Sequence, residues 1–322
     1  MLENLRRKSL VKTYKDLRHP INFEQGHVIY LDLFSFGQHK QKLSRERING
    51  LFPSTFDGGS KEFRLISYTL RDVQFNMIYC PSGTFTMGHI DQTNNPPRLE
   101  TIERLFLLGE TEITQELYEK VMGNNGSKFK NPQNPVENVS WEDAILFCNE
   151  LSRLQGLELC YTKNPKSLDF RWDCDFSKNG YRLPKEKEWE YAAKAGTKNK
   201  YVGTDNDNDL GKYAWFGEDQ DIGSTHPVAT KLPNEWGFYD MGGNVSEWCW
   251  DKYNPNSKKF SNYRVLRGSS WFGNDVTLRS AHRIASKPSD LLFNKGFRVC
   301  RSVVNWAIFS FYLWCSLKTL LR

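Results

Sequence analysis

Residues 237–248, which read GFYDMGGNVSEW, constrain the fold of this chain more than any other stretch. The three glycines permit positive φ angles and close approach of backbone to backbone. Asp240 and Glu247 add hard anionic oxygens, and a loop of this composition can fold around Ca²⁺ with carboxylates and backbone carbonyls as ligands. The structural alternative is a tight turn capped by Asp240 and Asn244. Both interpretations remain open from this stretch alone.

Eight short motifs, rich in Gly, Asn and Trp, follow one another along the chain. They are GTFTMG at 83–88, EITQ at 112–115, NPVENVSW at 134–141, NGYRLP at 179–184, the stretch at 237–248, LRGSSW at 266–271, LRSAHR at 278–283 and GFRV at 296–299. In this order the set closely resembles the formylglycine-generating-enzyme, or sulfatase-modifying-factor, family. The resemblance implies that family's variant of the C-type-lectin-like fold, an α+β domain of short strands, a few helices and long loops. A shared fold does not by itself assign an activity.

The chain is expected to comprise three regions. Residues 1–75 form an N-terminal accessory region, 76–301 the formylglycine-generating-enzyme-like domain, and 302–322 an apolar C-terminal tail. Thirteen Lys and Arg against eight Asp and Glu make the first region basic, whereas the central domain is near neutral. The sequence therefore predicts no nucleic-acid groove in the domain. The ten Trp of the chain can supply a core even where regular structure is sparse.

Three helices and several strands are signalled locally. Ser140 is a good N-cap, with Asp143 at the position that completes a capping box. Thr114 similarly caps a helix over residues 116–122, and acidic residues in the first turn favour a third helix over 185–194. In the accessory region, residues 27–34 read as a buried strand.

The cysteines indicate a reducing compartment. There are seven, with no CxxC pair, and no secretory signal is visible at the N-terminus, so we expect a cytoplasmic protein. Cys160 and Cys174 flank a turn signal at 164–167, which predicts a hairpin. On that hairpin the two thiols either face each other or remain half-buried and free.

Residues 303–317 are almost free of charge. A membrane-spanning helix needs about 17–25 residues, so this segment is short for one. Trp306, Tyr312 and Trp314 nevertheless suit a membrane interface. Three alternatives stay open: the tail packs on the domain, makes membrane contact that would localise the protein there, or is an aberrant translated end.

The resemblance also implies where an oxidase site would lie. In the family, two cysteines shortly after the Gly-Gly-Ser block hold Cu(I), which soft thiolates select, and a substrate Cys is oxidised to formylglycine. Here the first position falls on Gly273 and the second near Leu278, and no Cys occurs between Cys249 and Cys300. We therefore expect no copper site. A second branch of the superfamily binds iron through a His-x-x-x-His-x-Glu pattern, and none of the six His has that spacing, so no iron site is expected either.

A calcium site is the family feature that the sequence retains. Carried over residue by residue, its ligands are the Asp240 side chain, the Gly243 and Val245 carbonyls and the Glu247 side chain. A second family calcium site maps near residues 213–214, where the expected side-chain ligand is missing, so we expect that site to be absent or altered.

The function that these features favour is a non-catalytic module with bound Ca²⁺ that recognises a protein or peptide ligand. Trp215, Trp271 and Phe272, beside Ser270, would then be surface anchors; the alternative for each aromatic is core packing. Two other functions stay open. One is an oxygen-dependent oxidoreductase of the formylglycine-generating type acting on a protein cysteine, and the other is a membrane-associated accessory protein.

Overall fold

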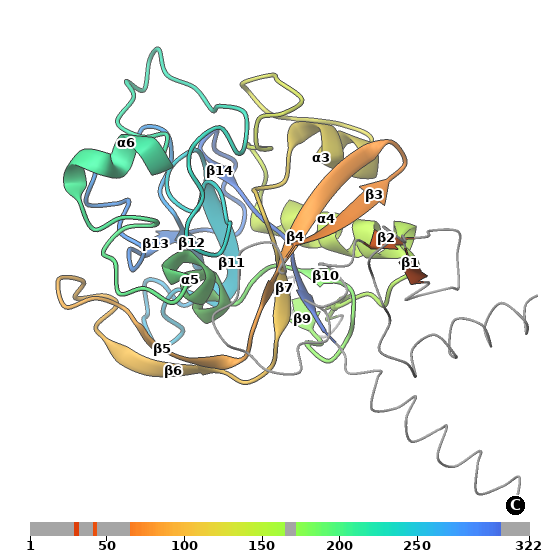
Figure 1. The fold of residues 1–322 in the computed structure, drawn as a ribbon, viewed down its shortest axis with the longest axis horizontal. Coiled ribbons are helices and arrows are strands. Elements are labelled where there is room, and N and C mark those ends of the chain that lie inside the picture. The colour runs from red at the N-terminus through yellow and green to blue at the C-terminus, as the bar shows by residue number, and fades with distance from the viewer. Residues whose placement is uncertain (1–28, 32–40, 44–64, 165–171, 304–322) are drawn as a thin grey trace, which may run out of the picture.

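Short strands and long loops make up most of the molecule, as the ribbon of the computed structural model shows (Figure 1). The structure describes residues 29–31, 41–43, 65–164 and 172–303. Its helices are few and its strands form several small sheets, so the expected α+β class is confirmed.

A five-stranded sheet joins the two ends of the domain. Its strands, in spatial order, are β10 (Tyr181–Arg182), β15 (Cys300–Ser302), β7 (Phe106–Gly109), β4 (Val73–Cys80) and β3 (Leu65–Leu70). All neighbours are antiparallel. The boundary expected between residues 75 and 76 falls inside β4, and β3 pairs with β4 along its whole length. The domain therefore extends upstream of the expected boundary, at least to Leu65.

A second sheet carries the end of the glycine-rich stretch. Its order is β13 (Ile284–Ser286), β12 (Arg264–Arg267), β11 (Ser246–Lys252) and β14 (Lys295–Gly296). The β11–β14 pair is parallel and the other two pairs are antiparallel. Two-stranded ladders complete the architecture: β1 (Ile29–Leu31) with β2 (Gln41–Leu43), β5 (Gly83–Met87) with β6 (Arg98–Ile102), and β8 (Tyr161–Lys163) with β9 (Trp172–Cys174).

The three predicted helices are confirmed, with their caps. They are α3 (Gln115–Met122), α4 (Trp141–Leu154) and α5 (Glu186–Lys194). Thr114 accepts a hydrogen bond from the backbone N–H of Leu117, and Ser140 forms the capping box with Asp143. A 3₁₀ turn, η2 (Asp207–Asp209), and the short α6 (Leu210–Tyr213) follow α5.

The predicted hairpin around the two cysteines is present as β8–β9. Its register sets Tyr161 opposite Cys174, so Cys160 falls on the other face of the ladder from Cys174. Both thiols are free, Cys160 buried and Cys174 half-buried. Burial raises the pKa of the Cys174 thiol to about 12, which keeps it protonated at neutral pH.

Most of the accessory region and the tail lie outside the described residues. The strand predicted over 27–34 corresponds in part to β1, and of the residues from 303 onward only Val303 is described. Within the described ranges, no helix is both long enough and apolar enough to cross a membrane.

Helix α5 lies against β11 and β12 of the second sheet and against the β5–β6 ladder (Figure 1), and buried ion pairs connect it to both larger sheets. Glu188 holds Arg182 of β10, with Nη1–Oε2 and Nη2–Oε1 distances of 2.7 and 2.8 Å. Glu186 and Glu190 hold Arg267 of β12 at 2.9 and 2.6 Å. Burial alone would raise the pKa of Glu188, but the charge of Arg182 lowers it overall.

Glu188→Gln should test whether this helix depends on its ion pairs. The substitution keeps the shape of the side chain and leaves the buried Arg182 without a counter-charge, so we expect the free energy of unfolding to fall by about 3–5 kcal/mol. The matched control is Glu150→Gln, in the exposed pair with Arg153, where the loss should stay below about 1 kcal/mol. Equal losses in urea unfolding would show that the buried pair does not hold the helix.

Candidate functional site

The glycine-rich stretch forms a loop before β11, and several of its residues, including Gly237 with a φ of 92°, have left-handed backbone conformations. Asp240, Gly243 and Asn244 have φ angles of 53°, 81° and 55°. A Cβ at Gly243 would lie 2.1 Å from the carbonyl oxygen of Trp215, so only glycine fits where these two backbones meet. This backbone conformation is thus compatible with both alternatives, a tight turn and a metal-binding loop.

Asp240 is buried with half of its carboxylate unused. Oδ2 accepts the backbone N–H of Ala229 at 2.8 Å, whereas Oδ1 is buried and has no hydrogen-bond partner. Burial raises the pKa of Asp240 to about 6. A buried unpartnered carboxylate oxygen is costly, and a cation beside it would remove that cost.

Glu247 is first of all an ion-pair partner. Its Oε2 accepts from Arg298 Nε at 2.6 Å and from the indole N–H of Trp189 at 2.8 Å, while Oε1 accepts from Arg298 Nη2 at 2.7 Å. Oε1 therefore keeps one lone pair for a further partner. Any metal bound by Glu247 would share this carboxylate with Arg298.

Glu112 is a third buried acid at the loop, which the sequence analysis missed. It accepts the backbone N–H of Val245 at 3.0 Å and the side-chain amide of Asn244 at 2.9 Å. Burial, together with the charges of Asp240 and Glu247, raises its pKa well above the ordinary value. Three carboxyl groups thus share one buried guanidinium, that of Arg298, and the loop favours an additional positive charge. Glu112 opens the EITQ motif at 112–115, but nothing in that motif connects it to Val245, which lies 133 residues away.

The described parts of the chain contain no cluster of three His, Cys, Asp or Glu side chains arranged as a metal site. A calcium site in this loop would consequently need the Gly243 and Val245 carbonyls as well as side chains. Asp240 fits such a site through its unpartnered oxygen, and Glu247 fits through one lone pair.

The first position of the family's oxidase thiols is crowded by hydroxyl groups. A Cβ at Gly273 would lie 2.0 Å from Ser269 Oγ and 2.9 Å from Thr277 Oγ1. These two hydroxyls are hydrogen-bonded to each other at 2.7 Å. A side chain at position 273 would therefore require Ser269 to leave Thr277.

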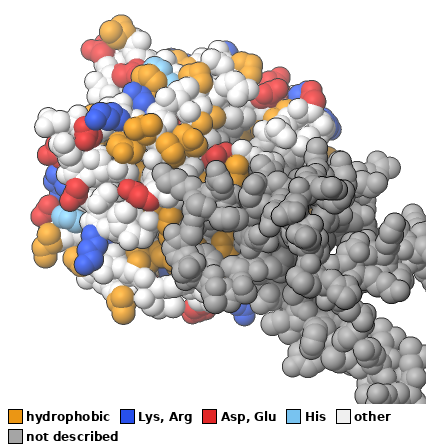
Figure 2. All heavy atoms as spheres, viewed as in Figure 1, with side chains coloured by type: hydrophobic (Ala, Val, Ile, Leu, Met, Phe, Trp, Pro, Cys, Tyr) orange, Lys and Arg blue, Asp and Glu red, His pale blue; other side chains and the backbone are white. Residues whose placement is uncertain are grey.

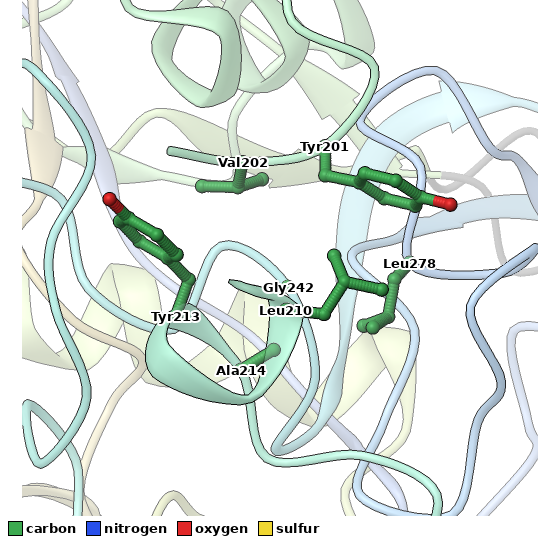
Figure 3. Close-up of a pocket in the computed structure, with 7 residues that line it drawn as sticks. All are labelled: Tyr201, Val202, Leu210, Tyr213, Ala214, Gly242 and Leu278. Atoms are coloured by element: carbon green, nitrogen blue, oxygen red, sulfur yellow. The ribbon is translucent and has the colours of Figure 1, made fainter. Parts of the chain in front are cut away.

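Leu278, near which the second position falls, lines an apolar pocket (Figure 3). Leu278 is buried beside Leu210, with the rings of Tyr201 and Tyr213 toward opposite ends of the pocket. The cavity holds only about 10 Å³, roughly the room of one water molecule. Residues 213–214, where a second family calcium site maps, contribute the ring of Tyr213 and the methyl group of Ala214 to this apolar lining.

Trp271 and Ser270 are core residues. Trp271 is fully buried and packs against the rings of Phe129, Phe272 and Phe293, with centroid distances of 5.6, 5.1 and 6.0 Å. Ser270 is buried beside it. The surface-anchor prediction for Trp271 is therefore wrong, because its neighbours enclose it.

Trp215 is half-buried and covered on two sides. The ring of His226 stacks on it at 3.7 Å, and Lys231 Nζ lies 3.8 Å from the ring centroid. Its indole N–H donates to Thr230 Oγ1 at 2.9 Å. Because its ring is already in contact with these groups, Trp215 is a poor anchor for a ligand.

Phe272 alone of the predicted anchors belongs to a partly exposed cluster of rings. Phe129, Phe272 and Phe293 are all half-buried over Trp271, and we call these three residues the aromatic surface. Lys128 Nζ lies 4.3 Å from the ring centroid of Phe293 and 5.0 Å from that of Phe129. Phe129 and Phe293 were not predicted from the sequence, because they come from loops that are distant along the chain.

The apolar character continues along the chain beside the aromatic surface. Leu291 and Leu292, which precede Phe293, are 53% and 44% exposed. On the face that Figure 2 turns to the viewer, hydrophobic side chains gather among charged ones.

Comparison with known proteins places these features in a family. The model of the sulfatase-modifying factor enzyme 1-like domain matches residues 63–303. The structure of Treponema denticola variable protein 1 superposes with a TM-score of 0.68 at 36% identity, over 74% of this chain and 99% of that one. The chaperone protein LppX of Paenibacillus barcinonensis is 33% identical over 61% of this chain and 80% of its own length.

Several relatives carry the name of the enzyme itself, two of them from Streptomyces coelicolor and Mus musculus. The formylglycine-generating enzyme of Streptomyces coelicolor is 31% identical, over 52% of this chain and 52% of the enzyme. The inactive C-alpha-formylglycine-generating enzyme 2 of Mus musculus is 30% identical, over 52% of this chain and 49% of that protein. The chain thus spans about half the length of these two relatives. Since the family model covers three quarters of its residues, the chain belongs to the sulfatase-modifying factor enzyme 1-like family.

Proposed function

We propose that this chain is a non-catalytic module that binds a protein or peptide ligand at the aromatic surface. One observation carries the proposal: Phe272 is half-buried in a cluster of rings, next to Gly273, the residue onto which the family resemblance carries the first oxidase thiol. In this chain, the segment that would hold the reactive metal in an oxidase contributes buried side chains such as Leu278 and the partly exposed ring of Phe272.

The aromatic surface suits an apolar side chain of a peptide. Partly exposed rings that pack on a rigid base bury apolar surface when a ligand binds, and they lose little side-chain entropy. This is typical of binding hot spots. Trp271 is the buried base on which the rings pack, and Lys128 places a cation over the ring of Phe293. Its ammonium group favours a ligand that carries an acidic residue beside the apolar one.

An oxidoreductase of the formylglycine-generating type is the alternative, and the name of the Streptomyces coelicolor relative favours it. That reaction would need two thiolates to hold copper. In this chain one position is closed by Ser269 and Thr277, and the other lies in an apolar pocket. The binding module therefore explains the site better.

We further propose that the loop at 237–247 binds Ca²⁺ and thereby stabilises the domain. Asp240 would contribute Oδ1, Gly243 and Val245 their carbonyls, and Glu247 its remaining lone pair. The bound ion would supply positive charge to a loop where Glu112, Asp240 and Glu247 share the single guanidinium of Arg298.

Substitution at the aromatic surface tests the proposed binding role. The probe is a peptide selected by the parent protein from a displayed library of random peptides. Phe272→Ala and Phe293→Ala should each weaken its binding at least about tenfold in isothermal titration, since each removes a ring from the surface. The control is Phe260→Ala, which removes a half-buried ring from a separate cluster with Tyr253 and Tyr263. Equal weakening by all three substitutions, or no saturable binding to any peptide, would contradict the proposal.

Calcium binding should depend on the ionisation of Asp240. In chelator the raised pKa makes Asp240 destabilising as pH rises from about 4 to about 6, because the folded state holds the proton more tightly than the unfolded chain. Calcium offsets this cost, so at pH 8 a hundredfold excess over Kd should add about 2.7 kcal/mol to the free energy of unfolding. The gain should shrink below about pH 6, where Asp240 is protonated.

Asp240→Ala should abolish the calcium response, whereas Asp72→Ala, at an exposed position, should keep it. The measurement is thermal unfolding with calcium and with chelator at pH 8 and pH 5. If the parent protein melts at the same temperature with and without calcium, the loop is only a turn.

A further inference from the structure

A second site lies away from the aromatic surface and goes beyond the proposed function. We infer that Arg279, Arg267 and His282 form a binding site for a small oxyanion, of the phosphate or carboxylate class, beside the loop that joins β5 and β6. The segment that carries two of these residues bonds to that loop through Arg279 to Asp91 and through the carbonyl of Ala281 to Asn95.

Arg279 presents an unfilled guanidinium edge. Its Nη1 meets Asp91 Oδ2 at 3.3 Å, while its Nε is buried and has no acceptor. The Nε–Nη2 edge of arginine is a planar fork that matches the two oxygens of a carboxylate or phosphate. The side chain is 18% exposed while Nε itself is buried, so an ion must displace the atoms that cover Nε to reach this edge.

Two further buried nitrogens without partners lie in the same neighbourhood. The Nη groups of the fully buried Arg267 are occupied by Glu186, Glu190 and the carbonyl of Ser280, but its Nε has no acceptor. His282 Nδ1 is likewise buried and unpartnered. Burial lowers the pKa of His282, and the charges of Arg267 and Arg279 lower it further. Arg267 Nη2 donates to the carbonyl of Ser280, and the backbone N–H of His282 donates to the carbonyl of Arg279, so the three residues lie in one neighbourhood.

An anion satisfies this arrangement better than the protein's own groups do. Buried polar atoms normally have partners, and here three nitrogens from neighbouring residues lack one. The nearby Glu186 and Glu190 are already bonded to Arg267. Asp91 is 52% exposed and holds Arg279 through one long contact, and such surface pairs are weak enough for a ligand to displace. An oxyanion would accept from Arg279 Nε and, in the Nδ1–H tautomer, from His282.

The test uses the full chain and two probes, inorganic phosphate and acetate, titrated separately at ionic strength held constant with sodium chloride. We expect saturable binding in isothermal titration and a matching rise in melting temperature for at least one probe, and the two arms separate phosphate from carboxylate recognition. Arg279→Lys keeps the charge and removes the fork, so it should weaken binding at least about tenfold. Arg153→Lys, at an exposed arginine paired with Glu150, should leave binding unchanged.

His282→Ala is the second variant, and it should also weaken binding if Arg279→Lys does not fold. The inference is overturned if neither probe stabilises the parent protein beyond sodium chloride, which would mean that the three nitrogens are simply hydrated. Unchanged affinity in Arg279→Lys, with a normal near-ultraviolet circular dichroism spectrum, would overturn it equally. The aromatic surface shares no residue with this site, so neither result bears on peptide binding.

Discussion

Buried arginine–glutamate pairs hold this loop-rich domain together. Helix α5 is only nine residues long, yet its Glu188 binds Arg182 in one sheet and its Glu186 and Glu190 bind Arg267 in the other. Removing either partner of such a pair would leave an uncompensated charge in a dry interior. With few regular elements to align the sheets, these pairs define where α5 sits, and α5 in turn supports the strands beside the candidate sites.

A buried arginine–glutamate pair also determines how the glycine-rich loop is held. Arg298 binds Glu247 through two nitrogens and also donates to the carbonyls of Gly109 and Tyr239, so it links the loop to the five-stranded sheet. Glu112 and Asp240 share that one guanidinium and have raised pKa values. In our account stability and ion binding are therefore coupled at this loop, because calcium would offset a charge that the protein itself leaves uncompensated.

Local signals in the sequence predicted the helices, whereas long-range contacts decided the site. The caps Thr114 and Ser140 act within four residues, and both helices begin where they predict. Arg267 and Glu186 are 81 residues apart, and no local pattern joins them. Trp271 was predicted as a surface anchor, but it is fully buried and rings from two distant loops enclose it. The order of the motifs was enough to predict the family fold, but it did not predict which individual side chains are buried.

The central claim is that the oxidase position has become packing and that the domain works by binding. Its most direct test is incubation of the parent protein with a sulfatase-motif peptide, copper and oxygen, with aldehyde measured by mass spectrometry. Because Gly273 and Leu278 offer no thiolate, the account predicts no tight Cu(I) binding and no aldehyde above the protein-free control. Catalytic turnover of the peptide to the aldehyde would contradict it.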